Sequence, residues 1–416
     1  MGAVKLIASQ AALLLVALFV GATLVLPYNG GYVLAYVLMG LALVQLLALL
    51  AARGRWEMGA AGWCLVGAFV LIAIAFSLNR DAPMMVNFLF LVAIVPLTSW
   101  LARFAAPDSA RIVSWLALVG TMLSATTAIY ETILLGNKRA EGWWSDPIWS
   151  AEAALILGFL SLMAFPTMRS PWRYLLLAGP VLAIGIVILS GSRGVLLAAP
   201  VIVLALLVTT FRPWWKQILA LAIALVIAGA VVLPTMPYAM KRVERAGVVV
   251  IQLLTTGTIK ERSAGARVEF WKAGTQAFLA SPITGHGWSD HLEAAYQYLP
   301  DKGKAYNQKG SSLRGNAHLH ADILDLGVSG GILGLFAYGL ILLAPLLGAL
   351  RSVRDSQFGA RLTGAIVLTT GYAACGLTYL MFGYEFHTTL YVCLAAIVLG
   401  FCRDEPLGRK PSPVAP

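Results

Sequence analysis

Residues 58–77 read MGAAGWCLVGAFVLIAIAFS and contain no charged side chain. A helix of about 20 apolar residues is long enough to cross the roughly 30 Å hydrocarbon core of a bilayer. Similar runs recur along the 416-residue chain, which is 59% hydrophobic and only 12% charged, whereas soluble proteins carry about 25% charged residues. Because backbone in lipid must satisfy its own hydrogen bonds, these runs predict an all-α polytopic membrane protein.

Twelve such runs are expected to form transmembrane helices. They are residues 8–27, 32–51, 58–77, 85–103, 112–131, 148–168, 173–190, 194–211, 216–234, 321–349, 362–381 and 386–402. No A-x-A-like cleavage site follows the first run, so we expect it to be retained and not removed as a signal peptide.

The distribution of Lys and Arg predicts the orientation of the chain. With the N-terminus in the cytoplasm, the short loops on that side carry fifteen of these residues, and the short outer loops carry four. Cytoplasmic loops are enriched in Lys and Arg, whereas long loops cross the membrane largely regardless of charge. We therefore expect both termini in the cytoplasm and an even number of spans.

The predicted spans divide the chain into four parts. Residues 1–234 hold helices one to nine, 235–320 form one large loop on the outer side, 321–402 hold helices ten to twelve, and 403–416 form a cytoplasmic tail. Short helices are expected within the large loop. In one of them, Val268, Trp271, Thr275 and Phe278 fall at helical spacing and predict its buried face.

Composition also limits the partners and cofactors. The net charge of +11 comes without a nucleic-acid-binding motif, and in a membrane protein it indicates contact with anionic lipids or phosphate ligands. The four cysteines form no CxxC pair, and the histidines lack zinc-site spacing, so we expect no metal and no cofactor.

Three arginines on the predicted outer side are candidates for binding an anion. Arg193 lies in SGSRG, at the turn between spans seven and eight, where glycines leave the backbone accessible to phosphate. Arg139 lies in NKRAEGWWSD and Arg267 in the large loop. Arginine suits bidentate phosphate contacts, although each residue alone also fits a turn or surface role. Ser192 is a weaker candidate in the same turn.

The stretch GNAHLHADILDLGVSGGILG, residues 315–334, supplies the candidate general base. A neutral histidine can accept a proton near pH 7, so His318 or His320 could deprotonate a hydroxyl. Asp322 is a weaker site candidate, since it and Asp325 are expected to stabilise the start of the following helix. Glu385 and His387, at the last outer turn, are weaker candidates of the same kind as the histidine pair.

These motifs together resemble those of the O-antigen ligase and polymerase superfamily of bacterial envelope glycosyltransferases. The family histidine precedes a leucine by four residues and two glycines by eleven and fourteen, as His320 precedes Leu324, Gly331 and Gly334. Ala321 replaces the usual asparagine. SGSRG, KRAEG, ARVEFWKAG and PITGHGW resemble further family segments in the same order.

The resemblance implies transfer of an O-antigen glycan from undecaprenyl pyrophosphate to a hydroxyl of lipid A–core, at the periplasmic face of the bacterial inner membrane. Residues 235–320 would then form a large periplasmic loop. In that scheme Arg193, Arg267 and Arg139 bind the pyrophosphate, and His320 acts as general base with His318 beside it. An α-linked donor would be inverted, without ATP or metal. The expected partners are the lipid-linked donor, the lipid A–core acceptor and membrane lipids, and no nucleic acid.

Two sister activities and a different class remain as alternatives. An O-antigen polymerase often carries glycine eleven residues after a periplasmic arginine, a pattern that none of the tested outer arginines shows here. A protein O-oligosaccharyltransferase tends to have a longer C-terminal region than this sequence. A secondary transporter places ionisable groups near the bilayer midplane, whereas the polar motifs here gather at one outer face.

Overall fold

The computed structural model describes residues 56–142, 146–219, 262–299 and 318–407, with scattered positions between 39 and 50 and between 223 and 255. Within these residues the chain is helical and contains no strand. The predicted spans 8–27 and 32–51, and most of span 216–234, lie outside the described residues.

The α-helices have these bounds: α3 Gly59–Leu78, α4 Ile94–Leu101, α5 Ser109–Ile129, α6 Pro147–Leu160, α7 Ala178–Ser190, α8 Arg193–Val208, α11 Arg262–Ala280, α12 His291–Tyr296, α14 Asp322–Leu350, α15 Phe358–Cys375 and α16 Glu385–Ala396. Tighter 3-10 segments are η1 Ala82–Ala93, η2 Ala102–Phe104, η4 Ser161–Ala164, η5 Pro171–Leu177 and η6 Arg212–Trp214. Wider π-helical turns are η3 Tyr130–Leu134 and η9 Ile397–Phe401.

Six helical stretches in the described part are long and apolar enough to cross a membrane. They are Gly59–Leu78, Ala82–Phe104, Ser109–Leu134, Pro147–Ala164, Pro171–Ser190 and Asp322–Leu350. A seventh stretch, α8 with the residues after η6, passes the same test but bends by 106°. These stretches confirm a multi-pass membrane protein, while the total of twelve spans stays a prediction.

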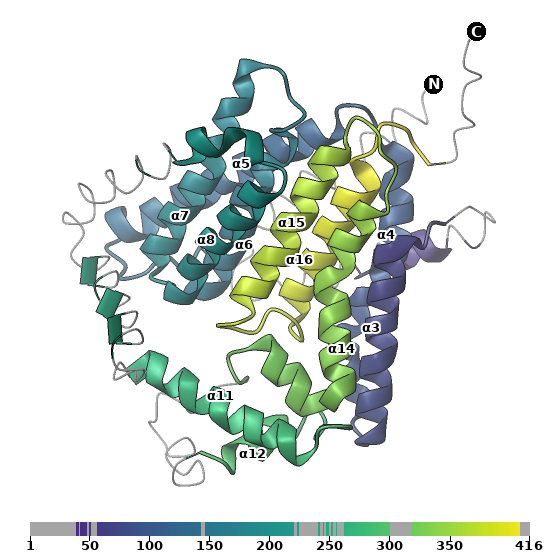
Figure 1. The fold of residues 1–416 in the computed structure, drawn as a ribbon, viewed down its shortest axis with the longest axis vertical. Coiled ribbons are helices and arrows are strands. Elements are labelled where there is room, and N and C mark those ends of the chain that lie inside the picture. Colours follow the sequence, from purple (N-terminus) through teal and green to yellow (C-terminus); the bar gives the residue numbers. More distant parts are fainter. Residues whose placement is uncertain are drawn as a thin grey trace.

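The helices pack into one bundle with two distinct ends (Figure 1). Helix α3 lies beside α14, whereas α5, α6, α7 and α8 form the other side, with α15 and α16 between the two groups. Helices α11 and α12 cross the bundle at one end, and the α14–α15 connection lies at the opposite end. Helices α11 and α12, which belong to the predicted large loop, therefore cover one end of the bundle.

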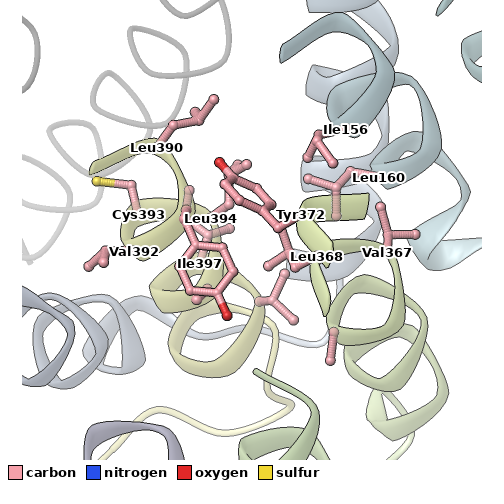
Figure 2. Close-up of a cluster of buried hydrophobic side chains, with 14 of the residues drawn as sticks. Ile156, Leu160, Val367, Leu368, Tyr372, Leu390, Val392, Cys393, Leu394 and Ile397 are labelled. Atoms are coloured by element: carbon pink, nitrogen blue, oxygen red, sulfur yellow. The ribbon is translucent and has the colours of Figure 1, made fainter. Parts of the chain in front are cut away.

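A buried apolar cluster joins α6, α15 and α16 in the middle of the bundle (Figure 2). Tyr372 is fully buried there and donates a hydrogen bond from its hydroxyl to the carbonyl oxygen of His387 at 3.1 Å. Around it pack Ile156, Leu160, Leu368, Leu394 and Ile397, among others. A rigid core of this kind fixes the helix ends that carry the polar residues.

Helix α14 is broken at Gly331, inside the predicted continuous span 321–349. Gly331 has φ 60° and ψ −145°, a conformation essentially confined to glycine. The carbonyls of Val328 and Ser329, freed by the break, accept hydrogen bonds from His286 N (2.8 Å) and Gly287 N (2.9 Å). The turn that contains His286 and Gly287 thus completes α14 across the break.

The buried face of α11 also differs from the predicted one. Phe270, Ala273 and Ala277 are buried, whereas Thr275 is exposed and donates its hydroxyl to the carbonyl of Trp271. Phe270, Ala273 and Ala277 form a small separate core with Leu319 and Val328. Alanine and glycine at this face let α11 approach the start of α14 closely, which a count of large apolar residues does not reveal.

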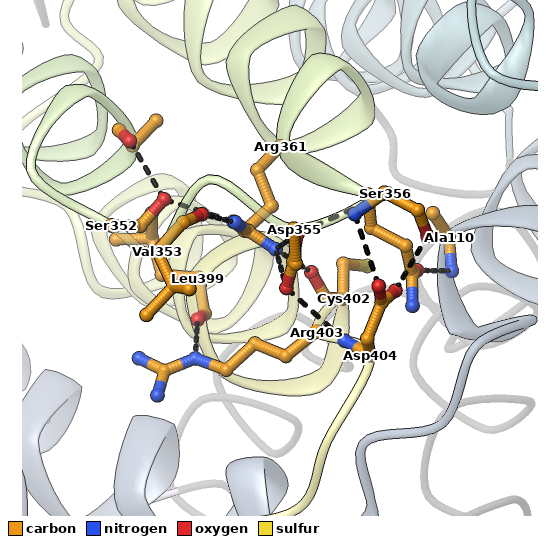
Figure 3. A network of polar contacts seen from close by, with 12 residues as sticks. Ala110, Ser352, Val353, Asp355, Ser356, Arg361, Leu399, Cys402, Arg403 and Asp404 are labelled. Atoms are coloured by element: carbon orange, nitrogen blue, oxygen red, sulfur yellow. Dashed lines mark hydrogen bonds and ion pairs between the residues drawn. The ribbon is translucent and has the colours of Figure 1, made fainter. Parts of the chain in front are cut away.

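At the opposite end, a fully buried arginine fastens the α14–α15 connection to the C-terminal segment (Figure 3). Arg361 donates to Ser352 Oγ at 3.0 Å, to the Cys402 carbonyl at 2.8 Å and to the Val353 carbonyl. It also pairs with Asp355 at 2.8 Å. A buried charge is tolerated because its donors all have partners.

Candidate active site

The turn SGSRG closes α7 and opens α8. Gly191 adopts a left-handed conformation, with φ 66°, that ends α7, and α8 begins at Arg193 two residues later. A Cβ on Gly194 would collide with Thr378 Oγ1, so glycine lets the segment after α15 lie directly against the start of α8. The predicted turn is confirmed. Gly191 ends α7, and Gly194 allows close packing against Thr378.

Arg139 is attached to this turn. Its Nε donates to the Ser190 carbonyl at 2.6 Å, and Nη2 lies 3.5 Å from Ser192 Oγ. The loop that carries Arg139 is itself folded around Glu131, whose carboxylate accepts from the backbone N–H groups of Glu141 and Gly142 at 2.7 and 2.9 Å. Arg139 is therefore held at the α7–α8 turn although 51 residues separate it from Ser190.

The three predicted arginines line one cavity of about 150 Å³. Its walls come from four distant parts of the sequence and are formed by Arg139, Ile148, Gly191, Ser192, Arg193, Gly194, Val195, Arg267 and Thr378. Ser192 is buried and donates its hydroxyl to the Pro147 carbonyl at 3.1 Å, so it joins the turn to the start of α6. Three guanidinium groups around one cavity favour a ligand with several negative charges.

Helix α11 connects this cavity to the histidines. Arg267 and Phe270 are three residues apart and so lie on the same side of the helix. Phe270 is buried, with its ring centroid 5.9 Å from that of His320. Arg267 on that side lines the cavity, and its positive charge acts on both His318 and His320.

His318 and His320 form a compact pair before α14. Their ring centroids are 4.3 Å apart, and His320 N donates to His318 Nδ1 at 3.0 Å. His320 has φ 60°, which is unusual for a residue with a side chain, and its Nδ1 is buried with no hydrogen-bond partner among the described residues. His318 thus supports the backbone of His320, as expected of a neighbouring positioning residue.

Both imidazoles are kept neutral by their surroundings. Burial, and then the positive charge of Arg267, lowers the pKa of His320 to about 4. Burial, followed by His320, Arg267 and His291, lowers the pKa of His318 to about 2. Near neutral pH both rings therefore lack a positive charge, which is the state that a general base requires.

The two aspartates of α14 act on other segments as well as lying in the first turn of their own helix. Asp322 Oδ1 accepts from Met381 N at 2.7 Å and from Phe382 N at 3.2 Å, and Asp322 N donates to the Gly376 carbonyl. Asp325 Oδ1 accepts from Leu319 N at 2.8 Å. The two carboxylates therefore do more than stabilise the helix start as expected, because both also bind the backbone of neighbouring loops.

Residues after α15 complete the site, and the sequence had placed them inside a span. Helix α15 ends at Cys375, not near residue 381, so Thr378 and Tyr379 lie in a loop. The Tyr379 ring packs 4.5 Å from that of His318, and its hydroxyl donates to Asp146 Oδ2 at 3.2 Å. Asp146 in turn caps α6 by accepting from Ile148 N at 2.7 Å.

Asp146 followed by Pro147 is the one signal that could have indicated this arrangement. Aspartate at the N-cap followed by proline at the first helical position is a recognisable helix start. The second oxygen of that cap binds Tyr379, so the helix start links the histidine loop to the cavity wall at Ile148.

A pair of ionisable side chains, His387 and Glu152, is fully buried deeper in the bundle. His387 Nε2 lies 3.1 Å from Glu152 Oε2, without the angles of a regular hydrogen bond, and both side chains have zero exposure. Glu152 is six residues into α6, or about 8 Å along the helix. Of the weaker candidates Glu385 and His387, only His387 is thus part of a buried polar contact among the described residues.

The described residues contain no group of three or more His, Cys, Asp or Glu side chains arranged to hold a metal ion. The free thiols of Cys375, Cys393 and Cys402 are buried apart from the cavity.

Fold and site define a multi-pass helical membrane protein with an arginine-lined cavity beside a histidine loop. Residues 178–339 match the model of a family described as O-antigen ligase, and this range includes Arg193, Arg267, His318 and His320. An O-antigen ligase of Escherichia coli (strain K12) is 21% identical over 260 residues, 62% of this chain and 59% of that protein. An uncharacterized protein of Haemophilus influenzae is 29% identical over 168 residues, 40% of this chain and 41% of that protein.

The chain is therefore similar to the O-antigen ligase family over residues 178–339, and to the Escherichia coli relative over a longer segment. The matched segments span about two fifths and three fifths of the two relatives' lengths.

Proposed function

We propose that this protein transfers an O-antigen glycan from undecaprenyl pyrophosphate to a sugar hydroxyl of lipid A–core. The observation that carries the proposal is the meeting of Arg139, Arg193 and Arg267 at one cavity beside the neutral His320. The family match over residues 178–339 supports the same reaction class. The site faces the periplasm in the proposed topology, with both chain termini in the cytoplasm of the cell.

The arginines bind the pyrophosphate and stabilise it as the leaving group. Charge-assisted bidentate contacts from guanidinium groups match phosphate oxygens, and fixed positive charge is most effective where negative charge develops in the transition state. Arg139 is held by Ser190, and Arg193 is fixed at the start of α8, so the cavity keeps its shape without bound donor. ATP and metal are not required by this scheme.

His320 acts as the general base. It takes the proton from the acceptor hydroxyl as that oxygen bonds to the anomeric carbon of the donor, while the bond from that carbon to phosphate oxygen breaks. Direct displacement inverts the anomeric centre. A pyrophosphate bound near Arg267 offsets the charge that lowers the pKa of His320, and so raises the basicity of the imidazole in the donor complex.

In vitro transfer with defined substrates tests the proposal. Purified protein in lipid vesicles is given a lipid-linked glycan donor with lipid A–core, a peptide or a second lipid-linked glycan as acceptor. We expect transfer to lipid A–core, unaffected by EDTA. Transfer only to the second glycan would indicate a polymerase, transfer only to peptide a protein O-oligosaccharyltransferase, and vesicle transport of a solute without transfer would contradict the proposal.

Substitutions separate the roles in the same assay. His320→Ala, Arg193→Ala and Arg267→Ala are each expected to reduce kcat by about 10²–10³-fold, the range for losing one group that stabilises developing charge. Arg111→Ala, on an exposed arginine at the other end, provides the control. Full activity of all three site variants at normal expression would contradict the mechanism.

A further inference from the structure

The backbone that carries His320 is held by three polar contacts. Leu319 N donates to Asp325 Oδ1 at 2.8 Å, His320 N donates to His318 Nδ1 at 3.0 Å, and Asp322 N donates to the Gly376 carbonyl at 2.8 Å. His320 itself is at φ 60°. A side-chain-bearing residue keeps such a conformation only when its surroundings enforce it, so these contacts determine where the imidazole lies.

One of these contacts extends to a further histidine. Asp325 Oδ1, which accepts from Leu319 N, also lies 3.1 Å from Nε2 of His291 on α12, and both side chains are almost completely buried. His291 Nδ1 lies 2.5 Å from the Trp288 carbonyl oxygen. Because a carbonyl oxygen cannot donate, Nδ1 carries a hydrogen, and Nε2 would otherwise meet the carboxylate with lone pair against lone pair. The contact therefore requires one proton shared between His291 and Asp325.

The same pair ties the histidine loop to the bundle. Trp288 stacks on His291 at 5.0 Å and packs edge-on against Phe88 at 5.2 Å, with Phe76 also adjacent at 6.1 Å. A continuous series of contacts thus runs from the bundle through Trp288, His291 and Asp325 to the residue before His320. Substitution of His291 would therefore release the histidine loop without changing any residue that lines the arginine cavity.

We propose that His291 and Asp325 are positioning residues for His320, and that their shared proton holds the histidine loop in its working position. This inference rests on the proposed function of His320. Loss of the contact between His291 and Asp325 is expected to lower kcat, whereas donor binding at the arginines is unaffected.

The experiment compares three variants of the full-length protein. His291→Ala removes the contact, whereas His291→Gln still offers a donor to Asp325. His286→Gln is the matched control, because His286 lies in the same segment and contacts the Ala277 carbonyl instead of the histidine loop. Steady-state glycan transfer is measured over a range of donor concentrations, together with hydrogen–deuterium exchange of the peptide that contains residues 318–326.

We expect His291→Ala to lower kcat about tenfold or more, as a small displacement of a catalytic group does, with KM for the donor within about twofold of the wild type. His291→Gln should recover part of kcat, because its amide can still donate a hydrogen bond to Asp325. Exchange of the 318–326 peptide should rise in His291→Ala and not in His286→Gln.

Wild-type kcat in His291→Ala, a donor KM that rises as much as kcat falls, or an equal effect of His286→Gln would overturn the inference. If His291→Ala does not fold, His291→Gln decides alone: kcat and exchange equal to those of His286→Gln would overturn the inference. A wild-type protein that transfers no glycan would overturn the proposed function instead, and the exchange data would still show whether His291 holds the loop.

Discussion

At the scale of single residues, the role proposed for His320 depends on how its imidazole is surrounded. Burial and the nearby charge of Arg267 keep its imidazole neutral, and His318 supports its backbone. A base with a pKa of about 4 is weak when the cavity is empty. Because the same arginine also lines the cavity, a bound anion strengthens the base only when the donor is present.

Arg267→Gln should reveal this coupling through pH. The wild-type base is active above the pKa of His320, so activity falls as pH drops through that value. Removing the positive charge raises the pKa of His320, and the acid limb of kcat/KM in the variant should therefore move to higher pH. The residual activity is measured as a function of pH.

Lys272→Gln supplies the control for this shift, since Lys272 is exposed on the same helix and should leave the limb in place. An acid limb at the same pH in Arg267→Gln and in the wild type would show that Arg267 does not act on the base.

At the scale of elements, the break in α14 at Gly331 shapes the site. The helix before the break carries Asp322 and Asp325, which fix two neighbouring loops, and the helix after it crosses the bundle. Gly334 packs against the Leu326 carbonyl of the preceding segment, where any Cβ would collide. The glycines at eleven and fourteen residues from His320 therefore bend the helix and close the bend.

Gly331→Ala tests the bend. The alanine would need a conformation that only glycine adopts readily, and its Cβ would collide with the Ile283 carbonyl. We expect a loss of about 1–3 kcal/mol from the strained backbone alone, seen as a lower thermal midpoint of the detergent-solubilised protein. Gly339→Ala in the same helix meets no atom within 4 Å and should be neutral or stabilising by up to about 1 kcal/mol. Equal midpoints for the two variants would contradict a required bend.

Apolar runs predict the spans well, because a helix that crosses a membrane needs about 20 consecutive apolar residues. The predicted spans 58–77 and 148–168, for example, match Gly59–Leu78 and Pro147–Ala164 closely. The bend at Gly331 has no comparable local signal in the sequence. It is stabilised by the backbone N–H groups of His286 and Gly287, more than forty residues earlier. Likewise, Tyr379 reads as part of an apolar run until Asp146 and His318 are seen beside it.

The sequence predicts only some of the candidate site residues. Arg139, Arg193 and Arg267 stand out because charge next to apolar runs is costly, and the structure brings all three to one cavity. The paired roles of His291 and Asp325 depend on a contact between α12 and α14 that neither segment indicates alone.

At the scale of the whole molecule, the two ends of the bundle have different polar construction. One end carries the cavity lined by three arginines, whereas at the other end Arg361 is fully buried and bonded to groups of the protein itself. Arg361 joins the α14–α15 connection to the segment after α16 (Figure 3). We therefore expect Arg361 to serve stability and the three-arginine cavity to serve the proposed chemistry.

Arg361→Met should therefore lower stability while leaving the chemistry of folded molecules intact. Methionine has a similar volume but no donors, so Asp355 and the carbonyls of Val353 and Cys402 lose their partner. Breaking a buried ion pair by removing one member costs about 3–5 kcal/mol, which thermal unfolding in detergent would register as a lower midpoint. Arg111→Ala is the control, since its exposed pair with Asp108 at 3.9 Å is worth at most about 1 kcal/mol. If Arg361→Met instead kept the wild-type midpoint and lost activity per folded molecule, the division between a stabilising end and a reactive end would be wrong.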